Sequence, residues 1–251
     1  MFAEQFNISL EYQKRFAEAD GFKQSADEFF SNPQVIGANI TMPFKDDALQ
    51  YANTLSSQAQ RAGAVNTLIR KENGFIGDNT DGYGLVTDLM NNSINLNDST
   101  VLLIGAGGAA KGVVPALVDA KVKRIDIYNR SANKAVDLCE YTNKYSSNTT
   151  QVYDARYVNT YDLIINATSL SLQHNLPDIS DDIFITMPAV YDMVYLNKPT
   201  AFLAHAKSLG CNKCIDGLGM LVNQAARSFE LWFHKTPDTA PVLEYLRAQL
   251  K

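Results

Sequence analysis

The stretch VLLIGAGGAAKGVV, residues 101–114, decides the fold that this sequence predicts. A short apolar run, typical of a buried strand, leads into Gly105, Gly107 and Ala110 in the spacing G-x-G-x-x-A, and a helical pattern follows. This spacing allows a tight turn, close approach of a pyrophosphate to the backbone, and close packing of helix on strand. The N-terminus of the helix would face the anion. We therefore expect dinucleotide binding at this turn; a bare structural glycine turn is the alternative.

The segments after the glycine turn continue the same alternation. The sequence predicts strands at 124–129 and 161–168, and helices from 108 to about 120 and from 133 to about 144. Pro115 lies inside the first of these helices, where loss of a backbone hydrogen bond is expected to kink or shorten it. The order strand, helix, strand, helix, strand predicts a doubly wound parallel sheet.

The loop after the predicted strand at 124–129 indicates which dinucleotide binds. An acidic residue about 20 positions after the glycine turn would hydrogen-bond the ribose 2′-hydroxyl of NAD. This chain instead has YNRSANKA, residues 128–135, whose donors and positive charge suit a 2′-phosphate. We expect NADP, held here by Asn129, Arg130, Ser131 and Lys134; an exposed arginine in a loop is the alternative.

The first hundred residues also have an α/β pattern. They predict strands at 10–16 and 35–41, helices at 25–32 and 46–63, and a hairpin at 64–79 that turns at Asn73-Gly74. At the other end of the chain, residues 218–235 carry apolar side chains at helical spacing, and a last amphipathic helix follows Pro237.

The composition excludes several classes of partner. The chain has 251 residues, a formal net charge of −5 and a pI near 5.2, so it offers no basic field for nucleic acid or an anionic membrane. No stretch is long and apolar enough for a membrane span or a signal core. The three cysteines are too few for a disulfide framework and suit the cytoplasm. A small-molecule substrate is expected.

We predict no metal site in this sequence. The pair Cys211-x-x-Cys214 lacks the second pair or nearby histidines that zinc would need, and a structural role is expected for it. His174, His205 and His234 are scattered without ligand spacing.

Two segments carry candidate chemistry. Lys45 follows a short strand and a proline turn, and Asp78, Asn79 and Asp81 crowd into the glycine-flanked turn GDNTDGYG, residues 77–84. Taken separately, each has an ordinary explanation: a solvated surface lysine, and polar side chains that favour turns.

Taken together, the motifs resemble those of the shikimate dehydrogenase family, in its bacterial biosynthetic, NADP-dependent form. The resemblance covers almost the whole chain. In chain order, the segments that carry it are NITMPFK, AGAVNTL, GDNTDGYG, GAGGAAKG, YNRS, INATS, YDMVY and DGLGMLVNQA.

The resemblance implies NADPH-dependent, reversible reduction of 3-dehydroshikimate to shikimate, in a cleft between an α/β substrate domain and a Rossmann domain. It places the substrate domain at 1–81 and the NADP-binding domain at 82–217, with the C-terminal helices, 218–251, returning to the substrate domain. The oligomeric state is left open, and a homodimer is allowed.

The same resemblance assigns residues to the site. Lys45 matches the family's catalytic lysine and Asp81 its partner, a pair that could stabilise and protonate an oxygen that gains charge as hydride arrives. Hydrogen bonds to the ring hydroxyls are expected from Asn39, Thr41, Asn66, Asp81 and Gln224, with Tyr195 near the substrate carboxylate. The cofactor residues are expected to be Gly105, Gly107, Gly108, Ala109, Asn129, Arg130, Ser131, Lys134, Thr168, Met193, Gly217 and Met220.

Two departures from the family pattern stand out. Family members normally begin earlier, with a strand and a Ser-x-Ser turn that holds the substrate carboxylate, so we expect the true start to lie upstream of Met1; a chain that binds substrate poorly is the alternative. The segment NATSLSLQHN also lacks the glycine that usually follows soon after Ser169. A quinate/shikimate dehydrogenase of looser specificity and a non-catalytic NADP-binding protein are the competing functions.

Overall fold

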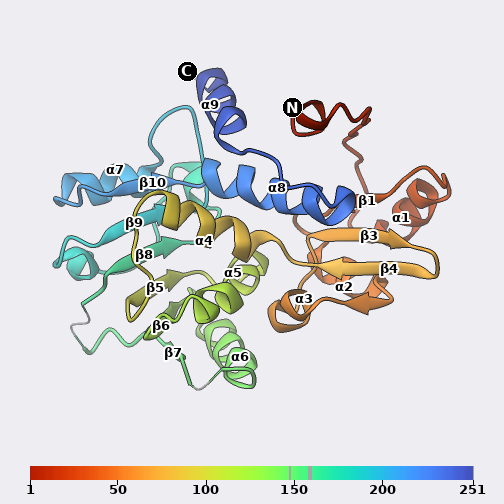
Figure 1. Cartoon of the computed structure of the whole chain (residues 1–251). Helices are drawn as coiled ribbons and strands as arrows, with labels where there is room; N and C mark the ends of the chain where they lie inside the picture. The colour runs from red at the N-terminus through yellow and green to blue at the C-terminus, as the bar shows by residue number, and fades with distance from the viewer. Residues whose placement is uncertain (147, 158–159, 251) are drawn as a thin grey trace.

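The structure, a computed structural model, describes residues 1–146, 148–157 and 160–250. The strands of this described part form two sheets, one drawn at the right of Figure 1 and one at the left. The first sheet is four-stranded, in the order β1 (Gly37–Asn39), β3 (Thr67–Lys71), β4 (Gly74–Asp78) and β2 (Thr54–Leu55). β1 and β4 run antiparallel to β3, and β2 runs parallel to β4. The predicted hairpin with Asn73-Gly74 at its turn is therefore confirmed as β3–β4.

The second sheet is six-stranded and parallel throughout. Its central strands are mostly apolar and buried between helices, whereas the strands at the two edges are partly exposed. Their spatial order is β10 (Cys214–Asp216), β9 (Ala189–Asp192), β8 (Leu163–Asn166), β5 (Thr100–Ile104), β6 (Arg124–Tyr128) and β7 (Thr150–Val152). The chain reverses its direction of winding between β5 and β8, so the predicted doubly wound sheet is confirmed. Ligands bind at such a switch point, outside the carboxyl ends of the strands.

Helices pack against both sheets (Figure 1). In the N-terminal part they are α1 (Phe22–Phe30), α2 (Lys45–Tyr51) and α3 (Ser57–Ala62). The second sheet is accompanied by α4 (Asp81–Asn91), α5 (Gly108–Asp119), α6 (Ala132–Asn143) and α7 (Ala201–Ser208), and the chain ends in α8 (Leu218–Phe233) and α9 (Ala240–Gln249). Short 3₁₀ helices occupy Ala3–Phe6, Leu170–Gln173 and Asp181–Phe184.

Helix α8 links the two sheets. Figure 1 shows it running beside α4 from the second sheet to the first. Glycine lets these helices approach closely, because a Cβ on Gly84 of α4 would lie 2.7 Å from the Met220 carbonyl oxygen of α8. At the far end of α8, Trp232 Nε1 donates to the carbonyl oxygen of Leu68 in β3 at 3.0 Å. The C-terminal end of α8 thus contacts the first sheet.

The start of α8 is fixed by a buried carboxylate. Asp88 of α4 lies so close to Gly219 that a Cβ there would fall 2.0 Å from its Oδ1. The Tyr191 hydroxyl, at the core of the second sheet, donates to Asp88 Oδ2 at 2.7 Å. Burial raises the pKa of the Asp88 carboxyl, and the hydrogen bond from Tyr191 opposes that rise. At this end, helices α4 and α8 are therefore joined to the second sheet.

Two predictions of secondary structure are wrong. Residues 10–16 form neither strand nor helix, and Tyr12 and Phe16 in this segment are exposed. A strand needs a hydrogen-bonded neighbour, and this segment does not pair with β1. The region 46–63 is two helices rather than one, because Asn53 pairs with Phe75 of β4 and Ser56 Oγ caps α3 through the Ala59 amide.

Pro115 does not end helix α5. The helix continues through it to Asp119, close to the predicted end. The Pro115 carbonyl oxygen accepts a hydrogen bond from the Arg61 guanidinium at 3.1 Å, which joins α5 to α3.

The three cysteines are free thiols in apolar surroundings. Burial raises the pKa of Cys139 to about 11, and burial also raises the pKa of Cys211 and of Cys214. Because the thiolate is the nucleophile, we expect iodoacetamide at pH 8 to label Cys139 and Cys211 at least tenfold more slowly in the native protein than in urea, as measured by mass spectrometry. Rapid labelling of the folded protein, or a disulfide between Cys211 and Cys214, would contradict this description of the core.

Candidate active site

Lys45 and Asp81 form an ion pair between two helices. Lys45 is the first residue of α2 and Asp81 the first residue of α4, and Lys45 Nζ lies 2.5 Å from Asp81 Oδ2. Their side chains are only 13% and 9% exposed. An ion pair shielded from water in this way is screened much less than one on the surface. The structure therefore brings together the two residues that the sequence assigns to catalysis.

The other oxygen of the Asp81 carboxylate is also bound. Asn66 Nδ2 donates to Asp81 Oδ1 at 2.8 Å, while the Asp81 amide donates to Asn79 Oδ1 at 3.1 Å. Helix α5 closes the remaining side, because a Cβ on Gly112 would lie 2.9 Å from Asp81 Oδ2. The negative charge at the N-terminus of α4 is favoured by the helix dipole. Asp81 is thus fixed by its own turn, by Asn66 directly before β3 and by the helix that follows the glycine turn.

The glycine turn lies next to the ion pair. Gly105, with φ +114°, makes the turn after β5, and a Cβ on Gly107 would meet no described atom within 4 Å. This open space above the N-terminus of α5 is what a pyrophosphate needs. A Cβ on Gly108 would lie 3.8 Å from Lys45 Cδ. Lys45, beside the first sheet, thus reaches the expected dinucleotide site at the second sheet; Ala109 follows in the first turn of α5.

The loop after β6 lies at the same edge of the sheet. Asn129 Oδ1 accepts from the Ala106 amide at 3.1 Å, and Asn129 Nδ2 donates to the Ser131 carbonyl oxygen at 3.0 Å, so this amide ties the loop to the glycine turn. Arg130, Ser131 and Lys134 are exposed around the start of α6. Their donors are free to meet an anion.

The remaining cofactor candidates follow β8, β9 and β10. Thr168 Oγ1 donates to Asn166 Oδ1 at 2.7 Å, and Thr168 lies against Gly105. A Cβ on Gly217 would lie 2.1 Å from the Met193 carbonyl oxygen, so only glycine fits at that position. Met220, 8% exposed, belongs to the core between α4, α8 and the second sheet.

A set of polar side chains connects the ion pair to Asn39 and Gln224. Asn39 Nδ2 donates to Ser228 Oγ at 2.9 Å, and the Thr80 hydroxyl reaches Gln224 Oε1 at 3.4 Å. Sequence reasoning missed Thr67, Thr80 and Ser228, all of which are buried here. The only signal for Ser228 was its position one helical turn after Gln224. Among the described residues, no recorded hydrogen bond joins Tyr195, half-buried in the loop after β9, to this set.

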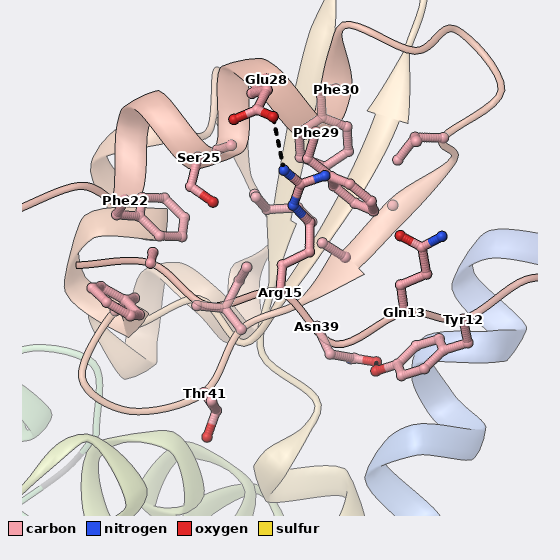
Figure 2. Close-up of a pocket in the computed structure, with 18 of the residues that line it drawn as sticks. Tyr12, Gln13, Arg15, Phe22, Ser25, Glu28, Phe29, Phe30, Asn39 and Thr41 are labelled. Atoms are coloured by element: carbon pink, nitrogen blue, oxygen red, sulfur yellow. Dashed lines mark hydrogen bonds and ion pairs between the residues drawn. The ribbon is translucent and has the colours of Figure 1, made fainter. Parts of the chain in front are cut away.

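A cavity of about 1350 Å³ adjoins this set on the side of β1. It is lined by residues 9–19, α1, β1 and the end of α8, and Figure 2 shows its aromatic wall at Phe22, Phe29 and Phe30. Asn39 and Thr41 lie at its border, whereas Lys45 and Asp81 are outside its lining. The Tyr12 hydroxyl donates to Asn39 Oδ1 at 2.9 Å, as the two facing side chains in Figure 2 show.

Neither a metal-ligand cluster nor a helix that could cross a membrane is found among the described residues. No group of three or more His, Cys, Asp or Glu side chains in that part of the chain is arranged to hold a metal ion. No helix in it is both long and apolar enough to cross a membrane.

Family models match three parts of the chain. The shikimate dehydrogenase substrate binding domain matches residues 1–68, shikimate / quinate 5-dehydrogenase matches 88–174, and the shikimate 5′-dehydrogenase C-terminal domain matches 217–247.

The chain is also similar to individual enzymes and to solved structures. Shikimate dehydrogenases (NADP(+)) of Shewanella halifaxensis and Colwellia psychrerythraea are 47% and 45% identical over all of this chain and 89% and 90% of their own lengths. The structure of Thermus thermophilus shikimate 5-dehydrogenase with NADP(H) and shikimate has a TM-score of 0.87 at 29% identity, covering 99% of this chain and 92% of that one. An Ael1 enzyme from Pseudomonas putida has a TM-score of 0.89 at 34% identity, covering 100% and 90%.

The same family is indicated by the matches over most of the sequence. The doubly wound sheet and the open glycine turn beside a buried lysine–aspartate pair agree with that family. This chain belongs to the shikimate dehydrogenase family.

Proposed function

We propose that the chain catalyses the NADP-dependent, reversible reduction of 3-dehydroshikimate to shikimate, with Lys45 and Asp81 as the acid–base pair. The observation that carries this proposal is the 2.5 Å contact between Lys45 Nζ and Asp81 Oδ2 beside the glycine turn at Gly108. The names of the relatives that match the chain from end to end support the reaction and its cofactor.

The residues at the carboxyl edge of the second sheet fit NADP. The open space above Gly107 and the backbone N–H groups of Gly108 and Ala109 suit a pyrophosphate, and the exposed Arg130 and Lys134 suit a 2′-phosphate. Bound there, NADPH supplies hydride to the substrate carbonyl. Binding would involve Gly105, Gly107, Gly108, Ala109, Asn129, Arg130, Ser131, Lys134 and Thr168, with Met193, Gly217 and Met220 bordering the nicotinamide.

Lys45 would supply the proton of the reduction. As the carbonyl carbon is reduced, negative charge develops on its oxygen, and the Lys45 ammonium stabilises that charge and transfers one proton to it. In the reverse direction the neutral amine takes the proton from the shikimate hydroxyl. Asp81, held by Asn66 and by its own turn, orients the lysine and accepts a hydrogen bond from a ring hydroxyl.

The polar set around the pair would select the substrate. A site built to hydrogen-bond hydroxyls rejects analogues that lack them, because its own buried polar atoms are then left unpaired. The proposed substrate contacts are Asn39, Thr41, Asn66, Asp81 and Gln224, with Tyr195 near the carboxylate. One matched family model includes quinate in its description, so turnover of quinate is the assay that separates strict from relaxed specificity.

Three further points of organisation are part of the proposal. The substrate domain would comprise residues 1–81 and 218–251 and the NADP-binding domain 82–217, which agrees with the separate sheets. A cytoplasmic location and assembly as a homodimer are also proposed.

Replacing Lys45 by methionine keeps the length of the side chain and removes its charge and its proton. We expect kcat for shikimate oxidation to fall about a hundredfold or more, while the Kd for NADPH changes less than twofold. The measurement is NADPH formation at 340 nm together with fluorescence titration of NADPH. Lys71→Met, at an exposed position on the β3–β4 hairpin, is the matched control and should retain full turnover. Near-normal turnover of the Lys45 variant would exclude the assigned role.

Replacing Arg130 by alanine tests the choice of cofactor. Because a guanidinium binds a phosphate through charge-assisted hydrogen bonds, we expect the KM for NADP to rise about tenfold and the KM for NAD to stay within twofold. Arg130 follows the C-terminal end of β6, and Lys123 is an exposed residue directly before its N-terminal end. Lys123→Ala should therefore change neither value. If the two Michaelis constants of the Arg130 variant rise together, the 2′-phosphate contact is wrong.

A further inference from the structure

Ser228 lies at the centre of the polar set that connects Asn39 to the ion pair. It is 0% exposed and is contributed by α8. Its Oγ lies 2.9 Å from Asn39 Nδ2, 2.9 Å from Thr67 Oγ1 and 3.3 Å from Thr80 Oγ1. A buried hydroxyl with polar neighbours from three separate segments constrains the orientation of each of them.

The charge of Asp81 determines the direction of these hydrogen bonds. A carboxylate only accepts, so the Asn66 amide nitrogen must face Asp81 Oδ1 at 2.8 Å, and the Asn66 oxygen must face the other way. There Asn66 Oδ1 accepts from Thr67 Oγ1 at 2.8 Å. The single hydroxyl hydrogen of Thr67 is thereby used, and Thr67 can only accept from Ser228.

The orientation of the Asn39 amide follows from its contact with Ser228. The Ser228 hydrogen points to Thr67 Oγ1, to the Gln224 carbonyl oxygen at 3.1 Å or to Thr80 Oγ1 at 3.3 Å. In each case a lone pair of Ser228 Oγ faces Asn39, whose Nδ2 donates to it and to Thr67 Oγ1 at 3.3 Å. Both amide hydrogens of Asn39 are therefore used inside the protein. Its oxygen Oδ1 is turned outward as an acceptor.

The outward oxygen already binds a hydroxyl group. Tyr12 donates its O–H to Asn39 Oδ1 at 2.9 Å, so the position suits a hydroxyl donor of the kind that a substrate ring carries. A reversed amide would present N–H groups there and would leave Ser228 Oγ without its donor.

We propose that Ser228 is a positioning residue that fixes the Asn39 amide so that its oxygen accepts a hydrogen bond from a substrate hydroxyl. This inference rests on the proposed function, because it assumes that Asn39 contacts substrate. Ser228 itself touches neither the substrate nor the cofactor and acts through Asn39.

The first experiment is Ser228→Ala, measured by steady-state kinetics of shikimate oxidation. Loss of the acceptor lets the Asn39 amide rotate, so we expect the KM for shikimate to rise about fivefold, with kcat and the KM for NADP within twofold of wild type. Ser99→Ala removes another buried hydroxyl, directly before β5 at the amino ends of the parallel strands, and should leave all three constants unchanged. An unchanged KM for shikimate in the folded Ser228 variant would overturn the proposal.

A double-mutant cycle with Asn39→Ala separates positioning from a general structural effect. If Ser228 acts through Asn39, its replacement raises the KM in the wild-type background and has no further effect in the Asn39→Ala background. Fully additive effects would overturn the inference. Ser228→Cys, which keeps the volume and a weak acceptor, should give an intermediate KM and takes the place of alanine if Ser228→Ala fails to fold. If Asn39→Ala alone leaves the KM unchanged, the proposed substrate contact fails instead.

Discussion

The ion pair between Lys45 and Asp81 is the interaction on which the proposed chemistry depends. The two residues begin different helices, α2 beside the first sheet and α4 beside the second, and they meet within 2.5 Å where the helix after the glycine turn passes. An ammonium in this position is sheltered from water and lies next to the expected dinucleotide site. The packing of α4 against α5 and α8 therefore holds one half of the pair in place, and in the proposed reaction this packing positions Asp81.

The negative charge of Asp81 also organises the surrounding polar groups. It determines the orientation of Asn66, through Asn66 that of the Thr67 hydroxyl, and through Ser228 that of Asn39. These hydrogen bonds fix the orientation of the Asn66 and Asn39 amides, so the site presents a defined pattern of donors and acceptors before any ligand binds. Such pre-orientation is what distinguishes one polyol from another, because a mismatched hydroxyl leaves a buried polar atom unpaired.

The features that a local pattern encodes were predictable from the sequence. The glycine spacing between an apolar strand and a helix predicted the doubly wound sheet, and Asn73-Gly74 predicted the hairpin. The pairing of Lys45 with Asp81 came only from family resemblance, since nothing in their spacing connects two residues that meet through tertiary packing. The strand at 10–16 was wrong because an alternating pattern forms a strand only beside a pairing partner. Ser228 was missed because a helical serine has no distinctive pattern until the register of the neighbouring strand is known.

The most direct test is a crystal structure of this protein with both NADP and shikimate bound. We expect Lys45 Nζ to lie within hydrogen-bonding distance of a ring hydroxyl whose carbon faces C4 of the nicotinamide, and Asp81 to contact the same ring. Shikimate bound in the cavity beside Tyr12 and Phe16, out of reach of Lys45 while the nicotinamide is ordered, would contradict this expectation.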